Sequence, residues 1–278
     1  LKVHKVCYNP SISMKSEVRN LESIKEYSEL VSLFDKQLQF AQNIQKKIIP
    51  QPSEFVSDTY HLYAMLKPFR KVGGDFYDFH NLDEDKISLI LADATGHGID
   101  AAMITSMVKL IYSYAMENEL VREHPSMLMQ RMERDIEKQL TSTYFSAFAL
   151  VLDPGANALR YANAGHPSAI LVGDDITLLK PSLPLVGLHQ LMSSINYQDI
   201  TVPFKNGDKF IIFTDGLIDA QNTSNELFSM ERLTEIVKKH MTHPINTICQ
   251  EILKEYNLFT EGTDDMDDVC LLGIEYDD

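Results

Sequence analysis

The chain has 278 residues, of which 44% are hydrophobic and 23% charged, as in a globular protein with a sizeable core. Its net charge of −15 argues against a nucleic-acid-binding surface and suits a protein that binds cations. The cysteines lie far apart without metal-site spacing, which predicts a reducing, cytoplasmic setting. No membrane span or signal peptide is visible. Because the chain starts at Leu1, we expect a fragment that lacks an upstream segment, such as a sensor domain or a membrane span.

The N-terminal segment predicts a linker over residues 1–14 and one long helix over residues 15–49, which contain no Gly or Pro. Apolar residues recur at heptad spacing, with Gln45 as a polar interruption, at Ile24, Val31 and Leu38 and at Tyr27, Phe34, Ala41 and Ile48. Such a stripe predicts a coiled-coil homodimer; the alternative is a helix packed flat on its own domain. We assign residues 1–49 to a linker and regulatory or dimerisation helix, and residues 50–278 to a second domain.

The second domain begins after Pro50 and alternates strand patterns with helix patterns. Strands are predicted at residues 59–66, 87–92, 144–152, 209–214 and 269–275, with a hairpin around Gly165, and helices at 99–116, 125–140, 229–240 and 245–257. Several strands are apolar throughout, so both faces of a sheet should be covered. Turn signals between the strands favour antiparallel pairing, and the fold class is a layered α+β sandwich.

Acidic residues stand at the strand ends in four separate motifs. Asp75 follows two glycines and leads into a strand-like segment, and Asp93 lies just past the strand 87–92. Asp215 follows the strand 209–214, and Asp267 and Asp268 precede the last strand. The alternative is that Asp-Gly pairs only mark turns. Carboxylates at strand ends can converge on one rim of a sandwich, where they would repel one another unless cations neutralise them.

Oxygen ligands without His or Cys predict two Mg²⁺ or Mn²⁺ ions and not Zn²⁺. Two such ions could bind a phosphate and lower the pKa of a bridging water, which would attack phosphorus in line. The sequence has no Walker loop, which argues against nucleotide hydrolysis of the P-loop type. It also has no cysteine in a phosphate-cradling loop.

Five segments, VGGDFYDF, DATGHGIDAAM, NAGHPSAIL, FTDGLIDAQN and DDVCLLGIE, occur in the order seen in bacterial phosphatases of the SpoIIE/RsbU type. The chain therefore resembles this branch of the metal-dependent PPM class of serine/threonine phosphatases over about residues 40–276. The segment LQFAQNIQKKIIPQP is similar to the linker helix that precedes such domains. The resemblance implies a four-layer α-β-β-α sandwich of antiparallel sheets with a long N-terminal helix.

The resemblance also implies roles for individual residues. Asp75 would bind metal through water, Asp93 would bridge both ions, and the carbonyl of Ala94 would add a ligand. Asp215 would be a further ligand. Asp267 would complete the ligand set of the second metal ion, with Asp268 as its less favoured rival.

Three further residues of the resembling segments have weaker assignments. Arg70 is a candidate phosphate contact, and the alternative is a surface arginine. His97 stands four residues after Asp93 and not two, as the acid histidine of eukaryotic members does, so a role in the turn is favoured. His166 is also expected to be structural.

The sequence thus predicts a Mn²⁺/Mg²⁺-dependent phosphatase acting on phosphoserine or phosphothreonine of a partner protein. The resemblance implies a STAS-domain anti-sigma-factor antagonist as that partner, and release of a sigma factor as the outcome. Two alternatives remain: a signalling module that binds such a partner without turning it over, and a phosphohydrolase of small molecules.

Overall fold

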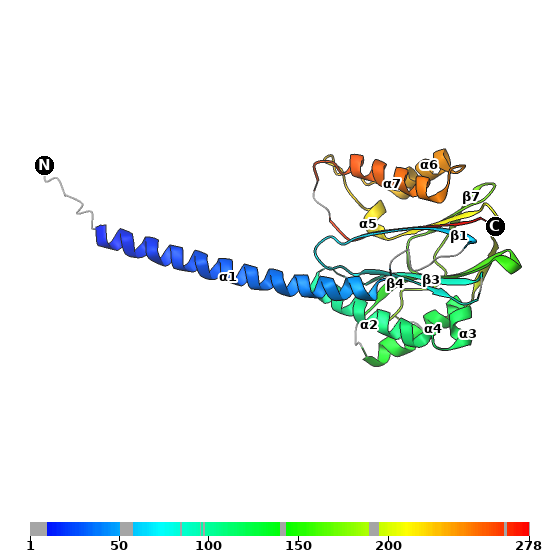
Figure 1. The fold of residues 1–278 in the computed structure, drawn as a ribbon, viewed down its shortest axis with the longest axis horizontal. Helices are drawn as coiled ribbons and strands as arrows, with labels where there is room; N and C mark the ends of the chain where they lie inside the picture. Colours follow the sequence, from blue (N-terminus) through cyan, green and yellow to red (C-terminus); the bar gives the residue numbers. More distant parts are fainter. Residues whose placement is uncertain are drawn as a thin grey trace.

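The computed structural model describes residues 10–50, 58–83, 85–94, 96, 98–139, 143–188, 195–263 and 266–277. Two five-stranded antiparallel sheets face each other, and helices cover both outer faces, so the body has four layers in the order α-β-β-α (Figure 1). The predicted α+β sandwich is therefore confirmed. None of the helices in these ranges has the length and apolar character needed to cross a membrane.

The helices agree with the predicted ones to within one or two residues at most ends, apart from α1, α3 and α5. Their bounds are α1 (Pro10–Ile48), α2 (Ile99–Ala115), α3 (Glu119–Glu123), α4 (Pro125–Gln139), α5 (Asp215–Ile218), α6 (Met230–His240) and α7 (Ile245–Phe259). The sequence analysis did not predict α3 and α5, which have five and four residues and are too short to show helical periodicity.

The strands are β1 (Tyr60–Lys67), β2 (Asp75–Asn81), β3 (Ile87–Ala94), β4 (Phe145–Asp153), β5 (Ala158–Ala164), β6 (Ala169–Val172), β7 (Ile176–Leu179), β8 (Ile200–Pro203), β9 (Lys209–Phe213) and β10 (Val269–Tyr276). Sheet A has the order β1-β10-β9-β6-β7, and sheet B has the order β2-β3-β4-β5-β8. A short 3-10 helix, Pro154–Ala156, joins β4 to β5.

The central strands are buried on both faces because each sheet packs on the other sheet and on a helical layer. In β3, for example, Leu89, Ile90 and Leu91 are all fully buried although successive side chains point to opposite faces. A second core lies between sheet A and the helices α6 and α7, and it includes Ile211 and Phe213 of β9 and Ile248 of α7. Apolar runs without alternation are the expected sequence of such strands.

The predicted hairpin around Gly165 is wrong. Strand β5 pairs with β4 and β8 in sheet B, whereas β6 pairs with β9 and β7 in sheet A, so the chain crosses between the sheets at this point. Asn163 supports the crossing, since its side chain accepts a hydrogen bond from the His166 amide and donates one to the Pro167 carbonyl. The true hairpin is the next one, β6 to β7.

Helix α1 extends far from the body with its N-terminal part and reaches the sandwich only near its C-terminus (Figure 1). It begins at Pro10, so the prediction of a linker over residues 1–14 is wrong for residues 10–14, and residues 1–9 lie outside the described ranges. Proline is well tolerated in the first turn of a helix, where its missing N–H leaves no bond unmade. Near the other end, Gln45 and Ile49 are buried against the body.

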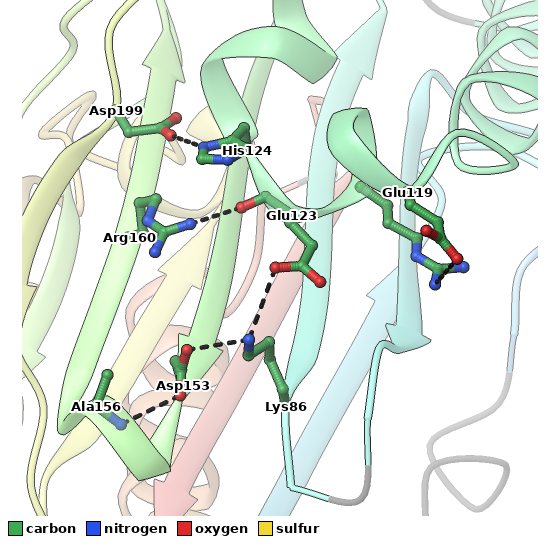
Figure 2. A network of polar contacts seen from close by, with 9 residues as sticks. Lys86, Glu119, Glu123, His124, Asp153, Ala156, Arg160 and Asp199 are labelled. Carbon is green, nitrogen blue, oxygen red and sulfur yellow. Dashed lines mark hydrogen bonds and ion pairs between the residues drawn. The ribbon is translucent and has the colours of Figure 1, made fainter.

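Figure 2 shows a polar network that joins the α3–α4 corner to the ends of several strands of sheet B. Lys86 lies 3.1 Å from Asp153 and 3.7 Å from Glu123, and the Arg160 guanidinium donates to the Glu123 carbonyl at 2.8 Å. Asp199, just before β8, accepts a bond from the Ser126 amide at 2.7 Å and lies 2.9 Å from Nδ1 of His124. The network fixes the helical layer on its sheet.

We expect Asp199→Ala to lower the free energy of unfolding, because the Ser126 amide in the first turn of α4 would lose its acceptor. Loss of such a cap costs roughly 0.5–2 kcal/mol. Urea denaturation of the metal-free protein measures the change. Glu235→Ala, at an exposed position of α6, is the control and should leave the midpoint unchanged. Equal midpoints for wild type and Asp199→Ala would show that the network contributes nothing.

Candidate metal centre

Asp75 and Asp93 lie opposite each other on neighbouring strands. Asp75 is the first residue of β2, and the antiparallel register with β3 places Asp93 beside it. The side chain of Asp75 is 3% exposed and accepts a hydrogen bond from the Thr214 hydroxyl at 2.7 Å. Thr214 belongs to the other sheet, where its hydroxyl also accepts a bond from the Cys270 amide. The two sheets therefore jointly orient Asp75.

Asp215 and Asp267 come together from sheet A. Strands β9 and β10 are antiparallel neighbours, so the end of β9 lies beside the start of β10. Asp215 stands two residues after β9, and Asp267 stands two residues before β10. Both aspartates line one cavity of about 230 Å³, together with Asp219 and Gly216. A Cβ atom on Gly216 would lie 2.0 Å from the carbonyl oxygen of Asp268, so the close approach of these segments requires glycine.

Burial and mutual repulsion disfavour the charged forms of these carboxyls. The pKa of Asp75 is raised well above its usual value by burial and by Asp93, against the opposing effect of the Thr214 hydrogen bond. Burial and then the charges of Asp215 and Asp267 raise the pKa of Asp93 to about 8. Burial and Asp267 also raise the pKa of Asp215. The aspartates predicted at strand ends thus form one interacting cluster.

The residues present fit hard divalent cations. Asp75 and Asp93 are cross-strand neighbours, and the charge of Asp93 helps to raise the pKa of Asp75. A cation can offset this repulsion, and the donors are all oxygens, as Mg²⁺ and Mn²⁺ prefer. Within the described ranges, no three His, Cys, Asp or Glu side chains already form a closed ligand set. The carboxylates are therefore neighbours that a cation would draw together.

The backbone carbonyl of Ala94 lies against the Gly74 segment. The Ala94 amide donates to the Gly74 carbonyl at 3.2 Å, and a Cβ atom on Gly74 would lie only 2.5 Å from the Ala94 oxygen. The predicted carbonyl ligand is thus next to Asp93 and close to the start of β2, at the edge of the acidic cluster. Glycine at position 74 is what allows this approach.

Asp267 and Asp268 have different surroundings although they are adjacent. The Asp268 carboxylate is buried and accepts hydrogen bonds from the Phe69 amide at 2.7 Å and the Gly74 amide at 2.5 Å. Asp267 is exposed, faces the cavity that Asp215 lines, and accepts a bond from the Asp268 amide. Asp268 is committed to the backbone, which favours Asp267 as the ligand.

Arg70, His97 and His166 are the other residues that the sequence singled out. Arg70 is exposed, and its guanidinium carbon lies 5.4 Å from the centre of the Phe69 ring. His97 lies outside the described residues, but Gly96 and Gly98 on either side have φ values of +97° and +79°, as a tight turn requires. His166 is buried with Nδ1 2.7 Å from the Ser146 hydroxyl, and burial lowers its pKa to about 3, which keeps the ring neutral.

The sequence analysis assigned no role at the site to Thr214, Thr105 or Gln45. Thr105 of α2 donates to the Gly74 carbonyl at 2.6 Å, and Gln45 of α1 bonds to Gly73. The available signal for Gln45 was a polar side chain on the apolar stripe of a helix. Thr214 and Thr105 stand in patterns that an ordinary strand or helix also shows, so only the structure identifies their partners.

Comparisons with known proteins support the same grouping. The family model described as Stage II sporulation protein E (SpoIIE) matches residues 83–277. The phosphoserine phosphatase RsbP of Bacillus subtilis is 25% identical over 247 residues, which are 86% of this chain and 58% of that protein. The phosphoserine phosphatase RsbU of Bacillus subtilis is 26% identical and covers 74% of this chain and 60% of its own length. The chain therefore spans less than two thirds of either relative.

Solved structures share the fold. The SiaA-PP2C domain of Pseudomonas aeruginosa has a TM-score of 0.79 at 23% identity, covering 88% of this chain and 98% of that one. RsbX in complex with magnesium has a TM-score of 0.58 at 16% identity, covering 80% and 98%. The PstP catalytic domain in complex with two manganese ions has a TM-score of 0.53 at 14% identity, covering 79% and 99%. Structural relatives with this fold thus bind Mg²⁺ or Mn²⁺.

The sandwich, the acidic cluster at the junction of its sheets and the match over residues 83–277 all agree. This chain belongs to the SpoIIE family of PP2C-type serine phosphatases and is related to RsbU and RsbP.

Proposed function

We propose that the chain is a Mn²⁺- or Mg²⁺-dependent protein phosphatase that hydrolyses phosphoserine or phosphothreonine on a partner protein. The observation that carries the proposal is the acidic cluster, in which buried or half-buried carboxyls raise one another's pKa at the junction of the two sheets. A protein gains no stability from such repulsion, so the arrangement supports a role in binding cations.

In this proposal each residue of the cluster has a distinct task. Asp93 and the Ala94 carbonyl would hold the ions directly, with Asp93 as a ligand shared by the two, and Asp75 would hold them through water. Asp215 and Asp267 would hold the second ion from the sheet A side. Bound ions would neutralise the phosphate and lower the pKa of a water. Thr214 keeps the Asp75 carboxylate turned inward by its 2.7 Å hydrogen bond, and exposed Arg70 is the candidate contact for the phosphate.

The partner protein is proposed by analogy. RsbP and RsbU carry the name phosphoserine phosphatase, and the resemblance of the motifs favours a STAS-type antagonist of an anti-sigma factor as substrate. A cytoplasmic location and an upstream sensor follow from the same analogy. The rivals are a module that binds the phosphoprotein without turnover and a small-molecule phosphohydrolase. Turnover of a phosphorylated STAS protein, compared with that of a generic phosphoester, separates the three.

Hydrolysis should require Mn²⁺ or Mg²⁺ and should stop when a chelator removes the metal. Asp93→Asn should lower turnover by about a hundredfold or more, since even outer-shell partners of a metal contribute 10–100-fold. The variant should still fold, because the substitution removes a carboxylate whose charged form is disfavoured by burial and by its neighbours. Turnover and thermal melting are measured with and without Mn²⁺.

The matched control is Asp174→Asn, an exposed aspartate in the β6–β7 turn, which should behave like the wild type in both measurements. Full activity of the wild type after verified removal of metal would refute metal-dependent hydrolysis.

Asp267→Asn and Asp268→Asn should fail in different ways. Asp267→Asn should lose most activity and one bound ion, yet leave the metal-free protein as stable as the wild type or more stable, because it removes repulsion from Asp93 and Asp215. Asp268→Asn should lower the metal-free melting temperature. The asparagine NH₂ group would replace one of the two carboxylate oxygens that accept the Phe69 and Gly74 N–H groups.

Calorimetric Mn²⁺ titration and thermal melting of both variants measure these differences. If Asp268→Asn loses an ion at unchanged stability while Asp267→Asn binds both, the assignment is reversed.

The long helix is proposed to form a parallel coiled coil between two copies of the chain. Its apolar stripe is uncovered in one copy, with Tyr27 69%, Val31 50% and Phe34 52% exposed. Contiguous exposed apolar surface of this kind marks an interaction site, and heptad spacing is the pattern of a two-helix coil. We retain residues 1–49 as the linker and regulatory helix and 50–278 as the phosphatase domain. Rotation of the helix would then move the segment before Asp75.

The double variant Val31→Glu with Leu38→Glu should convert a dimer into a monomer and alter turnover, because both positions lie on the stripe. Light scattering and phosphoprotein turnover are the measurements. Ser32→Glu with Gln39→Glu places the same charges at exposed polar positions of the helix and should leave the dimer intact. A wild type that stays monomeric at high micromolar concentration, with the Val31/Leu38 variant equally active, would exclude a dimeric switch.

A further inference from the structure

The carboxamide of Gln45 makes two hydrogen bonds to the backbone of a single residue, Gly73. Its Nε2 donates to the Gly73 carbonyl at 2.7 Å, and the Gly73 amide donates to its Oε1 at 3.2 Å. The side chain comes from α1, twenty-eight residues earlier in the chain, and is only 6% exposed. This is the pairing that a neighbouring strand would give, supplied instead by one side chain.

Gly73 has no strand partner of its own, because β2 begins two residues later at Asp75. A buried peptide group needs partners for both its N–H and its C=O. The next residue, Gly74, donates to Asp268, and its carbonyl accepts from Thr105 and from the Ala94 amide. The two peptides directly before Asp75 are thus fixed by four different elements of the fold. Gln45 is the member of this set that belongs to α1.

Apolar contacts hold the end of α1 on the body, since Ile49 belongs to the main core and Ile48 packs against it. A cavity of about 1080 Å³ lies beside it, lined by Gln42, Gln45, Lys46 and Ile49 of the α1 end and by residues of β1, α7 and the 68–75 segment. The Asp35–Lys71 pair also joins α1 to the segment, but both side chains are partly exposed, and such pairs contribute little. Gln45 therefore lies at the edge of a cavity, and its two hydrogen bonds form a buried polar link between α1 and Gly73.

We infer that Gln45 is a positioning residue for the metal centre: it holds Gly73, and through Gly73 it sets where Asp75 stands relative to Asp93. This inference rests on the proposed function, since it concerns how tightly the cluster binds its cations. A shift of α1 by one residue moves the side chain by about 1.5 Å along the helix axis, more than a hydrogen bond tolerates. Because of these two hydrogen bonds, the position of α1 affects where Asp75 stands in the site.

The alternative is that Gln45 only stabilises the fold. Three variants separate the two roles: Gln45→Leu removes both bonds, and Gln45→Glu keeps the acceptor for the Gly73 amide but loses the donor. Gln42→Leu is the matched control, the same change three residues earlier on the same helix, where the carboxamide oxygen accepts a hydrogen bond from Gln39 of α1 itself. Calorimetric Mn²⁺ binding, thermal melting without metal, and the Mn²⁺ concentration that gives half-maximal turnover are measured for each.

We expect Gln45→Leu to weaken Mn²⁺ binding by about tenfold, the usual size of an outer-shell effect, with turnover partly recovered at saturating Mn²⁺. Gln45→Glu should lie between Gln45→Leu and the wild type, and Gln42→Leu should match the wild type. Equal Mn²⁺ affinity for all four proteins, with or without a change in melting temperature, would overturn the inference.

Two further outcomes keep the test decisive. If Gln45→Leu does not fold, Gln45→Glu alone decides, because its shape is that of the native side chain. If the wild type itself binds no Mn²⁺, the proposed function fails, and the role of Gln45 fails with it. Normal binding by the wild type together with unchanged binding by the variants refutes the positioning role alone.

Discussion

The carboxylate of Asp268 is the interaction on which the geometry of the site depends. It stands at the start of β10 in sheet A and accepts backbone N–H groups of Phe69 and Gly74, which lead into β2 of sheet B. One side chain thus fixes the segment between β1 and β2 to the opposite sheet. Burial raises the pKa of Asp268, and the hydrogen bonds from the backbone offset that effect, so this charge is solvated by peptide groups.

Glycine is required around this carboxylate for steric reasons. A Cβ atom on Gly73 would lie 2.3 Å from Oδ2 of Asp268, and one on Gly216 would lie 2.0 Å from its carbonyl oxygen. Atoms cannot approach so closely, so any larger residue would push the sheet ends apart. The Asp-Gly pairs that suggest simple turns in the sequence are, in the folded chain, the places where two sheets and their connections meet at the closest distance.

Most of the fold and the acidic cluster could be predicted because they follow from local patterns. Continuous apolar runs indicated the strands β3, β4, β9 and β10. Once these strands form a sandwich, the aspartates at their ends come close to one another. The crossing between β5 and β6 could not be predicted, since Gly165 is compatible with a hairpin and the choice of sheet depends on distant partners. Strands β7 and β8 have only four residues each and are partly exposed, so they are too short to show a clear strand pattern. The distinct surroundings of Asp267 and Asp268 depend on backbone amides about two hundred residues earlier in the chain, which no local pattern reveals.

The position of β10 has a consequence for the order of folding. This strand lies between β1 and β9. Until residues 269–276 are in place, β1 is separate from the rest of sheet A, and the edge of β9 that pairs with β10 is open. A ribosome-bound chain that ends before residue 267 lacks Asp267 and Asp268, and with them the acceptor for the Phe69 and Gly74 amides. The pairing of β1 with β10 joins residues about two hundred apart, a contact of high order that slows folding. During synthesis the rim that carries the aspartates is therefore the last part of the domain to form, after both helical layers have emerged.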